Sequence, residues 1–296
     1  RVPFVGQGVG NPAVAMYYGN VNANSTSDRQ AVYLFADNFT EDSTTYTLLN
    51  EWAAQGSGTG ELQNPEDIAL DPAGNMFIAD TGNKRVVKYN TSGQQVAAWG
   101  SLGAADGEFL EPAGIAVDPA TNNVFVIDRS RGDVQVFNDS GIFQYKFGAE
   151  GTNADQFLNP SGIAVCDQSV YITDTDNNRV QWWTKLGVHV DNVGSAGTDY
   201  GQFNAPRGIV ADVNKSCRLA IVDTGNSRVQ IAAGDLSMVG SNQQPETFAS
   251  AGILNGQLSN PTDISIDEFG NYYIANEGVG RIEKFSRYGQ YMGRGE

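Results

Sequence analysis

The stretch GEFLEPAGIAVDPATNNVFVIDRSRGDVQVF, residues 107–137, contains the pattern that decides the fold. A glycine-rich turn leads through Pro112 into a first apolar run at 115–117, and two further apolar runs follow at 124–127 and 134–137. Residues typical of tight turns separate the runs, so we expect three β-strands. The runs are almost continuously apolar, which is typical of strands covered on both faces. A sheet of this kind needs similar sheets beside it.

The same pattern recurs along the chain. Each copy begins near a proline, continues with a second strand that ends in an acid or amide, and adds a third strand and a looser fourth one. The copies begin near Pro12, Pro65, Pro112, Pro160, Pro206 and Pro261. A four-stranded unit of roughly 40 to 50 residues, repeated six times, predicts an all-β fold, a six-bladed β-propeller of four-stranded antiparallel blades. We expect residues 1–296 to form this single domain, because a parallel β-helix would have a much shorter period.

The repeat resembles the NHL repeat. The shared pattern is a proline, a strand similar to Gly-Ile-Ala-Val-Asp, a second strand ending in Asp, and then Asn-x-Arg-Val-Gln, as in NPSGIAVC at 159–166 and NNRVQ at 177–181. It covers essentially the whole chain and is strongest in copies two to six. The resemblance implies a propeller that acts as a protein-binding or RNA-binding module, as a sensor ectodomain, or as an enzyme of the peptidylglycine amidating lyase kind.

Charge narrows these functions. The chain has 34 acidic and 18 basic residues and a formal net charge of −16. Such a surface repels phosphate backbones, so we expect no nucleic-acid partner. No apolar run approaches the roughly 20 residues that span a bilayer, so membrane insertion is not expected either. The chain opens at Arg1 without a signal peptide, which is typical of a mature or trimmed segment.

The two cysteines occupy related places in neighbouring copies. Cys166 ends the first strand of the fourth copy, and Cys217 directly precedes the second strand of the fifth. Both fall at the hairpin between first and second strands, so a disulfide is geometrically plausible. We expect it to stabilise the fold by about 3 kcal/mol. The alternative is a pair of free buried thiols, as in an intracellular protein.

Potential N-glycosylation sites lie in polar turns of the predicted fold. They are Asn24, Asn38, Asn90, Asn138 and Asn214. Their number is little above chance in a chain rich in asparagine, but Asn24, Asn90, Asn138 and Asn214 fall in turns where solvent is expected. Together with the cysteine pair they favour a secreted extracellular glycoprotein. Unused acceptor sites are the alternative.

A motif Asp-x-x-Asn-x-Arg recurs between the second and third strands. It spans Asp80 to Arg85, Asp174 to Arg179 and Asp223 to Arg228, with an altered form from Asn276 to Arg281. We expect each Asp to accept backbone N–H groups of its own turn and each Arg to tether adjacent segments. A calcium loop is the other interpretation, but Arg179 and Lys185 stand where its glycine and glutamate would be.

The third copy departs from this motif. Asp133 stands at the arginine position, with Arg129 and Arg131 nearby. Two further acids, Asp67 and Asp263, precede the first strands of copies two and six, where a propeller has the mouth of its central channel. They are candidate ligands for a cation such as calcium, and capping of the adjacent turn is the alternative role.

No catalytic set is evident. The amidating lyases use zinc held by several histidines, whereas this chain has only His189, on a predicted fourth strand. We therefore expect no zinc, no catalytic residues and no cofactor, calcium aside. The sequence predicts a secreted, non-catalytic module that binds a protein or glycan, or a structural subunit of an extracellular assembly or fibril. The alternative is a calcium-dependent hydrolase or lyase with its site at the channel mouth.

Self-association is one form of the predicted role. Residues 1–10 are a short extended lead that either packs on the last blade or is free, and the first copy departs most from the repeat through the insertion at 19–30. Because the two ends of the chain differ, contacts through them would be head-to-tail.

Overall fold

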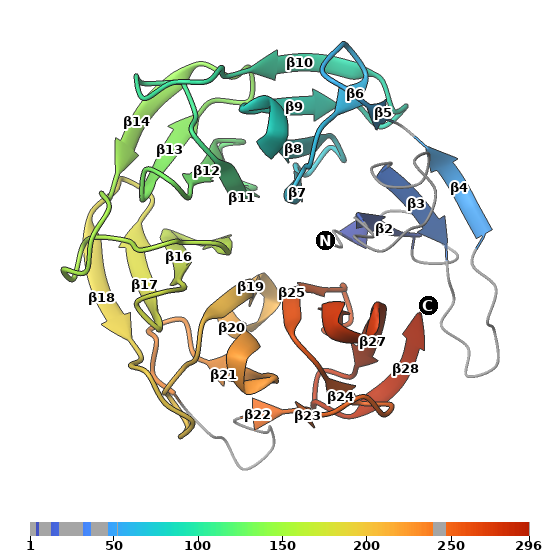
Figure 1. Ribbon diagram of the computed structural model, residues 1–296, viewed down its shortest axis with the longest axis vertical. Coiled ribbons are helices and arrows are strands. Elements are labelled where there is room, and N and C mark those ends of the chain that lie inside the picture. Colours follow the sequence, from blue (N-terminus) through green and yellow to red (C-terminus); the bar gives the residue numbers. More distant parts are fainter. Residues whose placement is uncertain are drawn as a thin grey trace. The chain divides into compact units, whose positions relative to one another are not determined.

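The computed structural model describes the side chains of residues 53–238 and 247–294, together with the backbone of four strands near the N-terminus and of Gly295. Within these residues the chain forms six four-stranded antiparallel sheets, one after another in sequence (Figure 1). In each sheet the strands lie in chain order. The predicted all-β propeller of four-stranded antiparallel sheets is therefore confirmed, and five of the sheets have described side chains.

The strands have the following bounds. The first sheet contains β1 (Phe4–Val5), β2 (Ala13–Tyr17), β3 (Val32–Ala36) and β4 (Thr47–Glu51); the second contains β7 (Asp67–Leu70), β8 (Met76–Asp80), β9 (Arg85–Tyr89) and β10 (Gln95–Trp99); the third contains β11 (Pro112–Val117), β12 (Val124–Asp128), β13 (Asp133–Phe137) and β14 (Phe143–Phe147). The fourth contains β15 (Ile163–Cys166), β16 (Ser169–Asp174), β17 (Arg179–Thr184) and β18 (His189–Val193); the fifth contains β19 (Pro206–Asp212), β20 (Arg218–Asp223), β21 (Arg228–Ala232) and β22 (Thr247–Phe248); the sixth contains β25 (Pro261–Ile266), β26 (Tyr272–Asn276), β27 (Arg281–Phe285) and β28 (Tyr291–Gly295).

Short elements join these strands. Two small parallel pairs, β5 (Ala54–Gln55) with β6 (Glu61–Leu62) and β23 (Ser250–Ala251) with β24 (Gln257–Leu258), form inside glycine-rich loops. The described helices are single 3-10 turns: η1 (Thr81–Asn83), η2 (Val213–Lys215), η3 (Thr224–Asn226) and η4 (Glu277–Val279). None of the helices in the described part of the chain has the length or apolar character to cross a membrane.

The chain divides into two compact units, one with strands β1 to β14 and the other with β15 to β28. In each unit, neighbouring sheets share an apolar core. In the first unit Phe77 and Val86 of the second sheet pack with Ile115 and Val126 of the third. In the second unit, one core joins the fourth and fifth sheets and another joins the fifth and sixth. Within each unit, these neighbouring sheets therefore bury apolar faces against each other.

Burial follows the predicted difference between inner and outer strands. All five residues of β8 and all five of β12 are buried, as expected of strands covered on both faces. The fourth strands β10 and β14 instead alternate between exposed and partly buried residues along most of their length. An end strand with one solvated face shows this period of two.

The N-terminal end of the chain differs from the prediction, whereas the C-terminal end forms the expected fourth strand. Phe4 pairs with Val14 and Val5 with Ala13, so part of the N-terminal lead is a strand of the first sheet. The expected start of that sheet near Pro12 is one strand too late, because an extended terminal segment satisfies its backbone groups by pairing. At the other end β28 pairs with β27. The insertion at 19–30 lies outside the described residues.

Each described glycine-rich loop ends in one fully buried side chain. These side chains are Leu62, Phe109, Phe157, Phe203 and Leu258. Burying a phenylalanine or leucine side chain stabilises the fold by roughly 2 to 3 kcal/mol. The loop closes through one recurring backbone bond, from a glycine N–H to the carbonyl of this buried residue, as in Gly103 to Phe109 at 3.2 Å. The loops are thus parts of the sheet packing and form a regular series.

Threonine hydroxyls link consecutive sheets beside these loops. Thr81 Oγ1 donates to the carbonyl of Pro112 at 2.6 Å, and Thr175 Oγ1 donates to the carbonyl of Pro206 at 2.9 Å. Both threonines directly follow the acid that ends a second strand. Thr224 has the same place in the fifth sheet, yet among the described residues its buried hydroxyl has no hydrogen-bond partner. The threonine that follows the motif acid therefore has a hydrogen-bonded hydroxyl in the second and fourth sheets and an unpaired one in the fifth.

We predict that Thr81→Val destabilises the protein by about 1 to 3 kcal/mol, because it leaves the buried carbonyl of Pro112 without this donor. Thr224→Val is the matched control and should be neutral or slightly stabilising, since it replaces an unpaired buried hydroxyl with a methyl group. Chemical denaturation of both variants measures the difference. Equal losses in the two variants would contradict the clamp.

Candidate functional site

A buried acceptor ends the second strand in every described copy. These residues are Asp80, Asp128, Asp174, Asp223 and Asn276, and each is at most 1% exposed. Each accepts the backbone N–H that follows the buried end of a glycine-rich loop, at 2.7 to 2.8 Å, as Asp80 does from Gln63. The expectation that the motif acid accepts backbone N–H groups of its own turn is wrong at Asp80 and Asp223. A buried carboxylate needs several donors; the loop supplies the backbone donor, and the turn contributes the side chain of the motif asparagine, as Asn83 does to Asp80.

The arginine of the motif ties the same loop to the acid. Arg85 Nε lies 2.7 Å from Asp80 Oδ2, and its terminal nitrogens donate to the carbonyls of Ser57, Gly58 and Glu61. Arg179 and Arg228 make the equivalent contacts in the fourth and fifth sheets. The predicted tethering by arginine is confirmed. The guanidinium groups of these three arginines therefore hold the glycine-rich loops in place.

The third sheet holds its loop with a relocated arginine. Arg131 donates to the carbonyls of Ala105 and Glu108 and lies 2.8 Å from Oδ2 of Asp133. Arg131 stands at the position of the motif asparagine, and Asp133 at that of the arginine. Asp133 also lies directly opposite Asp128 across the β12–β13 pair. The exchange therefore keeps the loop contacts but places two acids side by side in a buried region.

Burial raises the pKa of Asp133 to about 6, although the guanidinium of Arg131 acts in the opposite direction and Asp128 adds to the rise. The Oδ1 atom of Asp133 is buried and has no hydrogen-bond partner among the described residues. The folded chain therefore holds this proton more tightly than an unfolded aspartate, whose pKa is about 4. Stability from this group falls as pH rises from about 4 to about 6.

We predict that Asp133→Asn removes this part of the pH dependence. The amide oxygen can still accept from Arg131. The free energy of unfolding of the variant, relative to that of wild type, should therefore be about 2 to 3 kcal/mol higher at pH 7 than at pH 4. Unfolding curves at the two pH values measure the change. Asp155→Asn, at an exposed loop acid, is the control; a wild type and an Asp133 variant with parallel pH profiles would disprove the assignment.

The sixth sheet moves the negative charge instead. Asn276 replaces the motif acid, and Arg281 pairs with Glu283, whose side chain is fully buried. Burial raises the pKa of Glu283 above its ordinary range, against the opposing effect of Arg281. The third, fourth and fifth sheets have glutamine at the position of Glu283, namely Gln135, Gln181 and Gln230. In the sixth sheet the carboxylate that neutralises the arginine thus comes from the third strand and not from the end of the second.

We predict strong coupling between Asn276→Asp and Glu283→Gln. Glu283→Gln alone leaves Arg281 without a carboxylate and Asn276→Asp alone adds a second buried acid, whereas the double variant recreates the set Asp223, Arg228 and Gln230 of the fifth sheet. The double-mutant cycle should give a favourable coupling of about 1 to 3 kcal/mol. The reverse pair in the fifth sheet, Asp223→Asn with Gln230→Glu, should couple with the same sign. Additive effects in both cycles would contradict this relation.

The candidate metal ligands belong to different units. Asp67 Oδ1 accepts from the N–H of Ile68 and Oδ2 from that of Ile115, both at 2.6 Å. Its carboxylate thus serves the backbone, as in the alternative role. Asp263 lies on β25, where its Oδ1 would meet a Cβ added to Gly208 at 2.9 Å. Its role as a metal ligand stays a prediction.

A charge cluster lies beside Asp67. Arg129 forms a two-pronged ion pair with Glu66 and lies 3.1 Å from Glu111. Ser130 donates to the same Glu111. The sequence singles out Arg129 through the charge exchange in the third copy. It does not predict the ion pair with Glu66, which lies 63 residues earlier.

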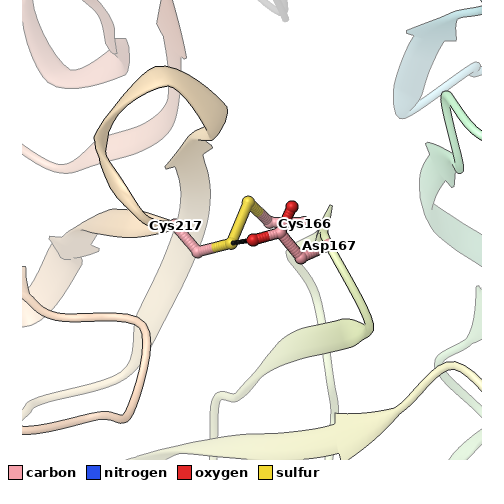
Figure 2. A group of neighbouring side chains, drawn as sticks. All are labelled: Cys166, Asp167 and Cys217. Atoms are coloured by element: carbon pink, nitrogen blue, oxygen red, sulfur yellow. Dashed lines mark hydrogen bonds between the residues drawn. A yellow bond between two sulfur atoms is a disulfide. The ribbon is translucent and has the colours of Figure 1, made fainter.

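The two cysteines form a disulfide between β15 and the turn that precedes β20. Their Cα atoms are 5.7 Å apart, within the range of a normal bridge. Both sulfur atoms are buried, and Oδ2 of the neighbouring Asp167 lies 3.3 Å from Cys217 Sγ (Figure 2). The pair is the one expected from the sequence. The carboxylate beside it had no sequence signal beyond its position next to Cys166.

His189 belongs to the scaffold of the fourth sheet. It lies on β18, edge-to-face with Trp183 at 5.2 Å between ring centroids, and its Nε2 is 3.0 Å from Asn192 Oδ1. Of the glycosylation candidates, Asn214 is exposed in η2, while Asn90 and Asn138 are half-buried and each accepts two backbone N–H groups of its own turn. Asn24 and Asn38 lie outside the described residues.

Comparisons with known proteins agree with this architecture. The NHL repeat model matches residues 62–89 and 157–183. No curated protein matches the sequence. Among solved structures, a catalytically inactive virginiamycin B lyase from Staphylococcus aureus with quinupristin is 14% identical, with a TM-score of 0.59, covering 94% of this chain and 87% of that one.

Two other structures are similar to the same extent. A chain in a nidogen/laminin complex is 14% identical, with a TM-score of 0.62 and coverage of 89% of this chain and 90% of that one. A protein of unknown function from Bacteroides caccae is 13% identical, with a TM-score of 0.61 and coverage of 91% and 90%. At these identities the likeness shows the fold alone.

The repeated sheets and these similarities define the class of fold as a β-propeller. More narrowly, the chain is a β-propeller that carries NHL repeats.

Proposed function

We propose that this propeller works outside the cell as a non-catalytic module that binds a protein partner. The observation that carries the proposal is that the glycine-rich loops combine buried polar contacts with exposed apolar side chains. The arginines and buried acids there hold the loops in place, whereas large apolar side chains on the same loops face solvent: Leu102 is 70% exposed, and Ile253 and Leu254 are each 68% exposed. Apolar side chains held in fixed positions at the surface suit contact with a protein.

The loop that carries Ile253 and Leu254 is firmly held. The Leu254 carbonyl accepts from Arg281 at 2.7 Å, its N–H donates to Gln257 Oε1 at 3.1 Å, and Gly252 N–H closes the loop onto the Leu258 carbonyl at 2.9 Å. A preorganised loop loses little conformational entropy on binding. This rigidity favours a protein partner for the exposed pair, and an apolar contact favours a protein over a glycan.

Two features support an extracellular location, and a third supports protein binding. The disulfide Cys166–Cys217 is of a kind that persists in oxidising compartments. The acceptor asparagine Asn214 is exposed. In addition, a chain of similar fold occurs in a nidogen/laminin complex, which provides a precedent for protein binding by this architecture.

A lyase is the second candidate, favoured by the similarity to virginiamycin B lyase and streptogramin B lyase. The inactive form of the first enzyme lacks a histidine. The single histidine of this chain, His189, lies on the fourth strand β18 of its sheet, where it packs on Trp183. Incubation with quinupristin, with and without divalent cations, tests this candidate by mass spectrometry. Turnover would replace the binding proposal with catalysis.

The binding proposal predicts that Ile253→Ser with Leu254→Ser leaves folding unchanged and weakens partner binding at least about tenfold. The control is Leu186→Ser with Val188→Ser, which alters two exposed residues at the β17–β18 turn, at the other end of the strands. Purified wild type is cross-linked to the extracellular proteins of its source, and the partner is then titrated against all three chains. Equal affinities would rule out these loops as the contact.

Sedimentation of the purified chain asks whether the partner is a second copy. Self-association that the loop variant abolishes would make the module a subunit of an assembly. A chain that stays monomeric at high concentration would exclude that form of the role.

We also predict glycans on Asn90, Asn138 and Asn214 when the chain passes through a eukaryotic secretory pathway. Asn214 should be the most fully occupied, because it is exposed while the other two are engaged in their turns. Mass spectrometry after enzymatic deglycosylation in heavy-oxygen water measures the glycan occupancy of each asparagine. Unmodified asparagine at all three would remove a main support for secretion.

A further inference from the structure

We propose that reduction of the Cys166–Cys217 disulfide creates a binding site for a thiophilic divalent cation, with Asp167 as the third ligand. Sulfur atoms from both cysteines and a carboxylate oxygen of Asp167 all lie within 4.8 Å of one another. Within the described residues this is the one such group of three potential ligands. The proposal goes beyond partner binding and does not depend on it.

The positions of the ligands suit a tetrahedral ion. Zinc bound by thiolate at about 2.3 Å and by carboxylate at about 2.0 Å has ligand atoms roughly 3.3 to 3.8 Å apart. Asp167 Oδ2 already lies 3.3 Å from Cys217 Sγ (Figure 2). The two sulfur atoms must move apart to bind the ion, and the 5.7 Å between their Cα atoms leaves room for this by side-chain rotation. Asp167 is exposed, so a water molecule can complete the coordination.

The backbone holds these residues in place. Asp167 has φ of +51°, and Ser216 and Cys217 have φ of +52° and +59°. These left-handed conformations belong to two tight turns, one in each sheet, which present the ligands toward each other. Asparagine and aspartate tolerate this conformation better than most residues, so Asp167→Asn preserves the turn.

The chemistry of the reduced pair favours a cation. A dithiol reductant opens the S–S bond: the bridge gains two electrons and two protons to become two thiols, and the reductant leaves as its own disulfide. The neighbouring carboxylate then disfavours a bare thiolate at Cys217. A divalent ion relieves this repulsion and displaces both thiol protons to solvent. Two sulfur ligands and one oxygen select zinc or cadmium over calcium.

The experiment uses the whole chain reduced with dithiothreitol and then freed of reductant under argon. Circular dichroism checks that the reduced protein keeps its fold. Cadmium is titrated while thiolate-to-metal absorption in the ultraviolet is recorded, and bound metal is counted by mass spectrometry. Oxidised wild type, reduced Asp167→Asn and reduced Asp155→Asn, at an exposed acid in the glycine-rich loop that Phe157 ends, are compared.

We expect one cadmium ion per reduced wild-type chain, no thiolate signal from the oxidised chain, at least about tenfold weaker binding by Asp167→Asn, and unchanged binding by Asp155→Asn. Reduced wild type that binds no cadmium would overturn the proposal. So would a chain that unfolds on reduction, since the site needs both turns in place. Equal affinity of Asp167→Asn and wild type would remove Asp167 from the site.

Discussion

In the second to sixth sheets, a single buried acceptor at the end of the second strand governs the local structure of the repeat. A carboxylate removed from water is tolerated only when donors surround it. The donors come from a loop that lies 16 to 19 residues earlier, from the motif asparagine and from the motif arginine, as Asp174 shows with Leu158, Asn177 and Arg179. The loop, the turn and the third strand are therefore fixed by one requirement.

The described copies meet this requirement with different residues. In the second, fourth and fifth sheets the acid and the arginine face each other directly. In the third sheet Arg131 reaches the loop from the asparagine position, and in the sixth Glu283 supplies the charge that Asn276 lacks. What the copies share is a loop held by a guanidinium and a guanidinium paired with one buried carboxylate. The residue that provides each group can change.

The sequence predicts the fold well because strand burial, turns and the acid at the second strand all repeat, and each copy supports the others. It predicts the cysteine pair because both residues fall at equivalent hairpins. It does not predict the contact of Asp67 with Ile115 or that of Arg129 with Glu66, since these join segments 48 and 63 residues apart and leave no periodic trace. The role of the N-terminal lead as strand β1 is also missed, because two residues carry too little pattern.

The fourth and fifth sheets are fastened to each other at both ends of their strands. Thr175 binds the carbonyl of Pro206 beside the glycine-rich loops, and the disulfide joins Cys166 to Cys217 at the opposite ends. Between these points lies a shared apolar core that contains Tyr171 and Ile221. Local opening cannot separate the two sheets at one end without straining the other. Amide hydrogens of β16 and β20 thus belong to one cooperative unit, whose exchange with solvent reports on the unfolding of both sheets together.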